Sequence, residues 1–346
     1  MIVKRFFSTM ALFLAAACAL LPQRSSFDET GSEGIRAALE AEAARGFSGA
    51  VLVVRGDRIL VDAAYGAERG APMRRNSRFW IASAGKQFTS AAVLKLRDRG
   101  LLTLDDPLEK FFPDAPDDKR TITVRQLLSH TSGFDQSYAS EELTNRAQAV
   151  RRMLAEPLID TPGAAFHYSN TNYQLAVAIV EVVGGLEYRV FVESELFKPA
   201  GLTDTGQASA ETTPTVAPAQ GDTPARLTKR HWGGQGDYST THDLFAWYRA
   251  LRSGRVIERD SIEALFSPVV AIGEGHAALG WFLGKTGSGA ARIFTRGNED
   301  FGANALIYAY PETATVVVVL SHAGDSPDDA SWSRAVHAKI EKILFP

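Results

Sequence analysis

Several chemistries are excluded by what the chain lacks. Its one cysteine, Cys18, lies in an N-terminal apolar segment, so the rest of the chain offers no thiol for a disulfide, a nucleophile or a metal site. Its seven histidines are scattered, without an H-x-H or H-E-x-x-H pair, which argues against a metallohydrolase. The nucleotide-binding motifs G-x-G-x-x-G and G-x-x-x-x-G-K-[ST] are both absent, and no cofactor is expected.

Two further absences concern partners and mechanism. No run of lysine and arginine occurs and the formal net charge is −3, so a nucleic acid is not expected as a partner. The G-x-S-x-G elbow that carries the serine of α/β-hydrolases is also missing. A serine enzyme of this sequence would have to activate its nucleophile in another way.

The N-terminus has the pattern of an export signal. Lys4 and Arg5 precede an apolar run, residues 6–21, that is too short to span a membrane, and small residues surround Cys18. We predict that residues 1–23 are a signal peptide and that the protein is periplasmic or extracellular, with no membrane span in its mature form. A retained anchor is the alternative. Cys18 could also carry a lipid and make the protein a membrane-anchored lipoprotein, although the residues before it fit that pattern poorly.

The two ends of the remaining chain are rich in strand patterns. A polar linker over residues 24–32 and an Ala/Glu-rich helix over 35–45 precede two apolar segments, which flank a tight turn at residues 55–58 as in a hairpin. A second hairpin turns at residues 311–312 and is followed by a C-terminal helix over 330–344. The predicted strands are residues 49–54, 59–65, 303–310 and 313–320.

Between these ends lies a mostly helical region. Residues 123–126 have the pattern of a capping box, and the apolar segment 173–183 ends at a Gly-Gly pair that stops a helix. We predict an α+β fold in which both chain ends build an antiparallel sheet with flanking helices, with a site in the cleft beside the helical insert. The predicted limits are residues 24–346 for the single domain, about 33–82 and 220–346 for its α+β part, and about 83–219 for the insert.

A serine and a lysine one helical turn apart begin this helical region. In residues 83–86, S-A-G-K, the side chains of Ser83 and Lys86 are three positions apart, so on a helix they share a face. The neutral Lys86 amine can then take the proton of the Ser83 hydroxyl, and the helix start favours negative charge that develops there. The tetrapeptide alone recurs by chance and is weak evidence.

Two longer motifs strengthen the interpretation of this pair. Residues 127–134 read L-L-S-H-T-S-G-F, and residues 162–173 read P-G-A-A-F-H-Y-S-N-T-N-Y. Together with Ser83-x-x-Lys86 they resemble, in order and over essentially the whole mature chain, the serine β-lactamase-like family of class C β-lactamases, D-alanyl-D-alanine peptidases and related esterases. The resemblance implies a serine hydrolase that forms an acyl-enzyme on Ser83 and cleaves a lactam, amide or ester bond.

The resemblance also implies roles for residues near the serine. Tyr168, of Y-S-N, would share proton transfer with Lys86, and which of the two is the base stays open. Asn170 would hydrogen-bond Lys86 and the amide of the substrate. From the local pattern alone, Tyr168 could be a core residue and Asn170 a helix cap. A second Y-S sequence at residues 238–240 heads a capped helix and is interpreted as structural.

The third motif of the family, Lys-Thr-Gly or His-x-Gly on a strand beside the cleft, has two candidates. Residues 285–287, K-T-G, match it literally but have the composition of a glycine-rich hairpin turn. By register with the family the match is instead Thr295, Arg296, Gly297 and Asn298, and Thr295 then replaces the usual cation. Arg296 would point to the opposite face of the strand and could substitute for the cation only at a bulge.

The change at Thr295 leaves acyl transfer possible, because the oxyanion would be held by the backbone N–H groups of Ser83 and Asn298. It puts recognition of lactam or peptide carboxylates in doubt and favours an esterase-like member that acts on a small molecule or peptide. The alternative is a penicillin- or peptidoglycan-peptide-binding protein without turnover, which the altered motif favours and the intact Ser83 and Lys86 oppose. Three histidines are expected to make structural hydrogen bonds or to line the cleft: His130, His167 and His231.

Overall fold

The structure is a computed structural model that describes residues 26–137, 140, 143, 145–209, 212–218, 236–299, 301–328 and 330–346. The predicted signal peptide, with Cys18, and His231 lie outside these residues. In the part of the chain that is described, no helix combines the length and the apolar character needed to cross a bilayer.

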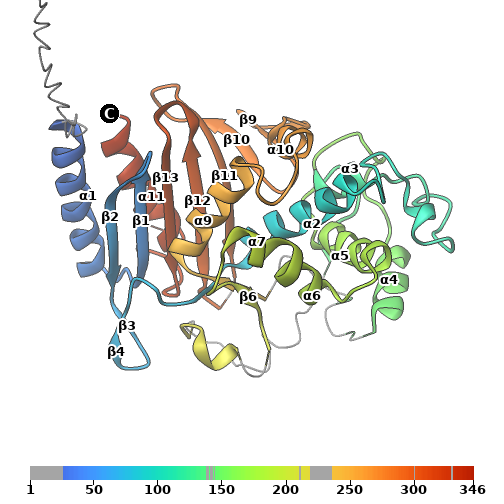
Figure 1. Ribbon diagram of the computed structural model, residues 1–346, viewed down its shortest axis with the longest axis horizontal. Coiled ribbons are helices and arrows are strands. Elements are labelled where there is room, and N and C mark those ends of the chain that lie inside the picture. The colour runs from blue at the N-terminus through green and yellow to red at the C-terminus, as the bar shows by residue number, and fades with distance from the viewer. Residues whose placement is uncertain are drawn as a thin grey trace, which may run out of the picture.

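An antiparallel sheet of eight strands forms the centre of the fold, in the order β2-β1-β13-β12-β11-β10-β9-β8. β1 pairs with β13, so both ends of the chain meet within the sheet (Figure 1). The prediction of a sheet built from both chain ends is confirmed, and the two predicted hairpins are β1–β2 and β12–β13. The strands are β1 (Gly49–Arg55), β2 (Arg58–Tyr65), β8 (Val270–Ile272), β9 (Gly275–Ala277), β10 (Phe282–Lys285), β11 (Ala291–Asn298), β12 (Asn304–Tyr310) and β13 (Thr315–Ser321).

The inner strands are apolar on both faces because helices cover both faces of the sheet. Along β1, Ala50 and Leu52 belong to the larger hydrophobic core on one face, whereas Val51 and Val53 belong to a second core on the other. β13 is buried along its whole length and continues both cores. The continuous apolar runs of β1, β12 and β13 are therefore inner strands, while β2 forms an edge of the sheet.

Two helices cover one face of the sheet: α1 (Ser26–Ala44) and α11 (Trp332–Leu344) lie side by side and pack Ile35 and Val336 onto it (Figure 1). The polar linker predicted over residues 24–32 is wrong from Ser26 onward, because α1 already begins there. Residues 28–34 carry no apolar side chain, so hydrophobic periodicity gives no sign of these first helical turns.

The opposite face carries α9 and the mostly helical region, in which α2 packs against α5. The predicted capping box is confirmed at the start of α3, where the Thr123 hydroxyl accepts from Gln126 N–H and the Gln126 side chain accepts from Thr123 N–H. α5 ends where predicted, and Gly185 after it is left-handed with φ 69°. The helices of this side are α2 (Lys86–Asp98), α3 (Val124–Leu128), α4 (Arg146–Ala155), α5 (Asn170–Gly184), α6 (Tyr188–Val192), α7 (Lys198–Ala200), α9 (Thr241–Arg252) and α10 (Arg259–Phe266).

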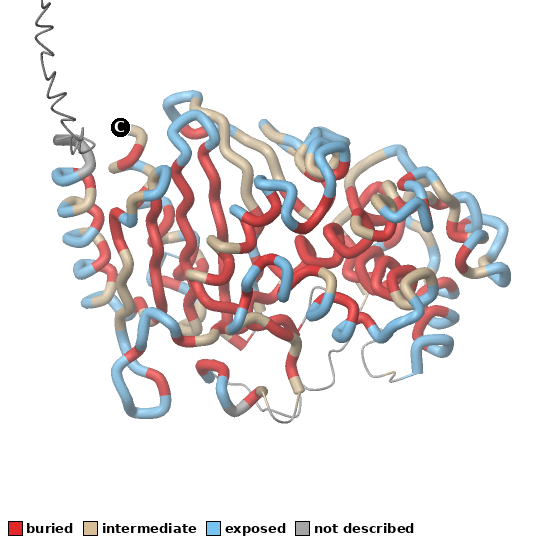
Figure 2. Tube along the Cα trace, viewed as in Figure 1, coloured by how far each residue is buried: buried red, intermediate tan, exposed pale blue. Residues whose placement is uncertain are grey.

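A small three-stranded sheet lies beside the start of α2, in the order β5 (Phe79–Trp80), β7 (Asp237–Ser239), β6 (Gly206–Gln207). A separate two-stranded hairpin joins β3 (Ala67–Glu68) to β4 (Ala71–Pro72). Figure 2 shows buried residues running through the inner strands and into the adjoining helices, with exposed residues on the outer helix faces. The segment between β5 and α2 is thus fixed at both ends within the buried part of the molecule.

Candidate active site

Ser83 lies in the turn that joins β5 to α2. Residues Ala82–Gly85 form one turn of 3-10 helix, and Lys86 is the first residue of α2, so Ser83 stands directly ahead of this helix. Ala82 has φ 49°, an uncommon value for a residue other than glycine. Such backbone strain at a turn marks a segment whose conformation is held by its surroundings.

The Lys86 amine, which is almost fully buried, connects Ser83 to the helical region. Its Nζ donates to Ser83 Oγ at 3.0 Å and to Asn170 Oδ1 at 2.9 Å. Nζ also lies 5.2 Å and 5.6 Å from the ring centres of Tyr168 and Tyr173. The serine, the lysine and Asn170, far apart in sequence, therefore form one hydrogen-bonded group.

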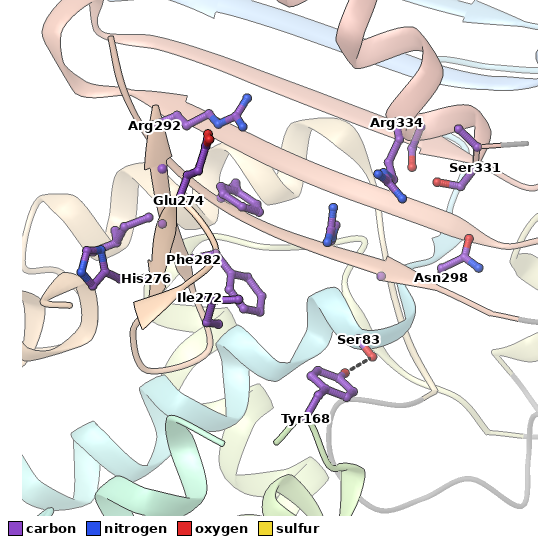
Figure 3. Close-up of a pocket in the computed structure, with 18 of the residues that line it drawn as sticks. Ser83, Tyr168, Ile272, Glu274, His276, Phe282, Arg292, Asn298, Ser331 and Arg334 are labelled. Atoms are coloured by element: carbon purple, nitrogen blue, oxygen red, sulfur yellow. Dashed lines mark hydrogen bonds between the residues drawn. The ribbon is translucent and has the colours of Figure 1, made fainter. Parts of the chain in front are cut away.

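Tyr168 reaches the serine from the other side. Its hydroxyl donates to Ser83 Oγ at 2.7 Å, as Figure 3 shows. The tyrosine ring stacks on the ring of His130, with centroids 4.4 Å apart. Ser83 Oγ is thus within hydrogen-bond distance of both an amine and a phenol, and either group is close enough to exchange a proton with it.

His130 is a buried wall of the site. Its Nδ1 accepts from the backbone N–H of Ser169 at 3.2 Å and lies 3.3 Å from the Asn172 amide. Burial, and the charge of Lys86, hold the pKa of His130 well below its usual range, so its ring is neutral at pH 7. His130 therefore makes structural hydrogen bonds and also lines the inner cleft, while His167 bonds Asp160 at 2.9 Å.

β11 is the strand that passes the serine. A Cβ on Gly297 would stand 2.2 Å from the carbonyl oxygen of Ile81 and 2.7 Å from Ser83 N, so only glycine fits where the strand crosses the turn. Thr295 is buried and lines the inner cleft together with Ser83 and Lys86. Of the two candidates for the third motif, residues 295–298 are the ones that lie beside Ser83.

The literal K-T-G sequence lies at the other end of β11. Lys285 pairs with Ala291, and Thr286 N–H donates to Ala290 O at 2.9 Å in the hairpin turn between β10 and β11. The six residue steps from Ala291 to Gly297 span about 20 Å of strand. Lys285 lines the distant part of the outer cleft and does not adjoin Ser83.

The hydrogen-bond pattern of β11 leaves one edge free beside the turn. Pairing with β10 ends at Phe294, and Glu299 N–H donates to Ala303 O of the neighbouring β12 side. Because N–H groups alternate in direction along a strand, the N–H of Asn298 points away from β12, toward the turn. The N–H of Ser83 is at a helix start, where it has no acceptor within the helix. Two N–H groups are therefore available near Ser83 Oγ.

Arg296 points to the opposite face from Thr295, as strand alternation predicts. The pairing of β11 with β12 is continuous from Ile293 to Asn298, without a bulge, so Arg296 does not take the position of Thr295. The exposed Arg296 side chain nevertheless lines both the outer cleft and the inner cleft, the latter together with Ser83 and Thr295. That Arg296 lines the cleft beside Ser83 was not apparent from the sequence.

The outer cleft has a volume of about 970 Å³ and extends from Ser83 along β9, β10 and β11 to the start of α11 (Figure 3). Phe166, Phe282 and Phe294 form a row of half-buried rings on its wall, with centroids of neighbours 6.4 and 5.5 Å apart. Its charged lining residues include Glu274, Arg292, Arg296 and Arg334. Of these, Arg292 donates to both oxygens of Glu341 at 2.9 Å. Within the described residues no cluster of three or more metal-ligating side chains occurs.

This architecture is that of the serine β-lactamases and penicillin-binding proteins, and the chain belongs to the beta-lactamase family, whose model matches residues 35–340. Penicillin-binding protein 4* of Bacillus subtilis (strain 168) is 28% identical over 334 residues, which cover 86% of this chain and 72% of that protein. The predicted family and the α+β fold are confirmed.

Two solved structures show the likeness in three dimensions. A penicillin-binding protein from Bacillus halodurans has a TM-score of 0.77 and 26% identity, with 89% of this chain and 99% of that chain covered. A D-stereospecific amidohydrolase from Streptomyces sp. has a TM-score of 0.72 and 26% identity, with 90% and 98% covered. Relatives of this fold thus include both a penicillin-binding protein and a hydrolase.

Proposed function

We propose that the protein is a serine hydrolase that forms an acyl-enzyme on Ser83. The observation that carries this proposal is the position of Ser83 Oγ, 3.0 Å from Lys86 Nζ and 2.7 Å from the Tyr168 hydroxyl. A serine hydroxyl needs an adjacent base to become a nucleophile. Both candidate bases of the family motifs meet that requirement in this chain.

The reaction follows from these positions. Ser83 Oγ bonds to the carbonyl carbon of an amide, lactam or ester while its proton passes to Lys86 or Tyr168. The N–H groups of Ser83 and Asn298 stabilise the oxyanion. When the tetrahedral intermediate collapses, the C–N or C–O bond breaks and the leaving group takes the proton. Water then attacks the ester on Ser83 and releases the acid, which regenerates the serine.

The lining of the cleft combines apolar rings with the Arg296 side chain, which lines the inner cleft together with Ser83 and Thr295. In the inner cleft Thr295 stands where the family motif has a cation. The amine of Lys86 donates a hydrogen bond to Asn170 Oδ1. The row of phenyl rings beside Ser83 offers an apolar surface for aromatic groups. Esterase-like or amidase-like activity is therefore proposed over lactam turnover. We also propose export of the protein, on the pattern of residues 1–23, with lipid attachment at Cys18 as the alternative to removal of this segment.

A second candidate function is binding without turnover, and the threonine at position 295 is the observation that favours it. Intact-protein mass spectrometry after incubation with a chromogenic cephalosporin or a short-chain nitrophenyl ester separates the two. We expect an acyl adduct and turnover for the wild type and for Ser194→Ala, an exposed serine on another helix, but not for Ser83→Ala. An adduct that persists in Ser83→Ala would refute the assignment of the nucleophile. Tight binding without any adduct would favour the binding protein.

A further inference from the structure

A carboxyl group is buried directly behind the nucleophile turn. Asp237, the first residue of β7, is only 1% exposed. Its main-chain oxygen accepts from Ile81 N–H at 3.0 Å, which ties β7 to the segment that leads into Ser83. No step of the proposed acyl transfer uses this side chain, so its position calls for a separate explanation.

The carboxyl group of Asp237 is poorly satisfied. Its Oδ1 accepts from Gln207 Nε2 at 3.3 Å, and among the described residues its Oδ2 has no hydrogen-bond partner. Oδ2 lies instead against Gly85, where a Cβ would stand 2.0 Å away. Native proteins rarely leave a buried polar atom unpaired, so each such atom calls for an explanation. The glycine of S-A-G-K thus makes room for a carboxyl oxygen.

Among the described residues, Lys86 is the charged group that acts on Asp237. Burial raises the pKa of Asp237 to about 7, while the positive charge of Lys86 on α2 acts in the opposite direction. Tyr188 on α6 is the other titratable group that faces it. Burial, and then the charge of Asp237, keep the pKa of Tyr188 well above its usual range, so this phenol stays neutral. β6 contributes the uncharged Gln207.

We propose that Asp237 is a positioning residue that acts through Lys86: its carboxylate, lodged against Gly85, holds a proton on the hydrogen-bonded group of Ser83, Lys86 and Tyr168. The inference rests on the proposed function, because its effect is on the reactivity of Ser83. It holds whichever of Lys86 and Tyr168 is the base, since a nearby negative charge favours the protonated form of either.

This coupling gives the reaction a particular dependence on pH. Below about pH 7 Asp237 is neutral and does not oppose the loss of the proton that activates Ser83. Above pH 7 Asp237 is ionised. Its carboxylate then opposes the loss of that proton, so a further rise in pH no longer favours the reactive form of Ser83. The rate of acylation should therefore level off near pH 7.

The test measures acylation of the full chain by a nitrophenyl ester between pH 5 and 9, followed at a wavelength where the product's absorbance does not depend on pH. In Asp237→Asn we expect the break near pH 7 to vanish. The ratio of its rate to that of the wild type should then rise by up to about tenfold between pH 7 and 8. Asp243→Asn is the matched control, because burial also raises the pKa of Asp243 but Lys86 is not among the groups that act on it. We expect Asp243→Asn to retain the break.

The outcomes separate this inference from the proposed function. Acylation of Ser83 with an unchanged break in Asp237→Asn would overturn the inference alone, and a rate loss uniform in pH would assign Asp237 a merely structural role. No acylation in any variant would overturn the proposed function. The infrared difference spectrum between wild type and Asp237→Asn gives a reading that does not need turnover. Its protonated-carboxyl band should disappear as the pH rises through about 7, and its absence at pH 5 would overturn the inference.

Discussion

Asp237 should make the folded protein less stable as the pH rises, and Asp237→Asn should remove that effect. The folded-state pKa of about 7 lies above the ordinary value of 3.8, so between these values the unfolded chain binds fewer protons than the folded chain. The free energy of unfolding is therefore not reduced by Asp237 below about pH 4, and it falls as the pH rises from there to about 7. A rise from 3.8 to about 7 corresponds to about 4 kcal/mol of unfolding free energy. Because the side chain is almost fully buried, solvent screening reduces this figure little.

Urea unfolding of wild type and Asp237→Asn at pH 4 to 9, followed by tryptophan fluorescence, measures this effect. At pH 4 the two proteins should be of similar stability, because a neutral carboxyl and an amide have nearly the same shape. The difference should grow in favour of Asp237→Asn up to about pH 7 and then remain constant at about 4 kcal/mol. A difference that is independent of pH would refute the reasoning, since it would mean that Asp237 has the same charge in the folded and unfolded chains.

The remaining predictions concern β11. Gly297→Ala should reduce acylation by at least about 100-fold, because its Cβ would stand 2.2 Å from Ile81 O and displace the strand from Ser83. Single-turnover kinetics measure this, and Gly287→Ala, in open space on the hairpin turn, is the control that should react normally. Thr295→Lys should raise kcat/KM for carboxylate-bearing esters over neutral ones by about tenfold, since it adds one charged contact in the inner cleft. No change there, together with a large loss in Lys285→Ala, would mean that the K-T-G sequence is the functional motif.

Local patterns in the sequence predicted the parts of the site that depend on local spacing. Ser83 and Lys86 are three residues apart, and one turn of helix brings their side chains together whatever the rest of the fold does. Tyr168 and Asn170 could be included only through the resemblance to a family, because a tyrosine before a helix is equally typical of a core. The structure places both within hydrogen-bond distance of that pair.

The parts that sequence patterns could not predict depend on contacts between distant segments. Strand alternation predicts that Arg296 and Thr295 lie on opposite faces of β11, but nothing local indicates that Arg296 also lines the cleft beside Ser83. Asp237 was missed for the same reason. It lies in a short strand whose partner, β5, is far away in the sequence, and only that pairing brings it behind Ser83.

Gly85 illustrates how a distant residue determines a local one. Its backbone is right-handed helical, with φ −64° and ψ −19°, so its conformation does not require glycine. A residue with a Cβ can adopt this backbone conformation without strain. An alanine Cβ would, however, stand 2.0 Å from Oδ2 of Asp237. The buried carboxyl group of Asp237 therefore explains the glycine inside the S-x-x-K turn. A smaller, apolar residue at position 237 would remove this steric conflict, and alanine would then fit at position 85.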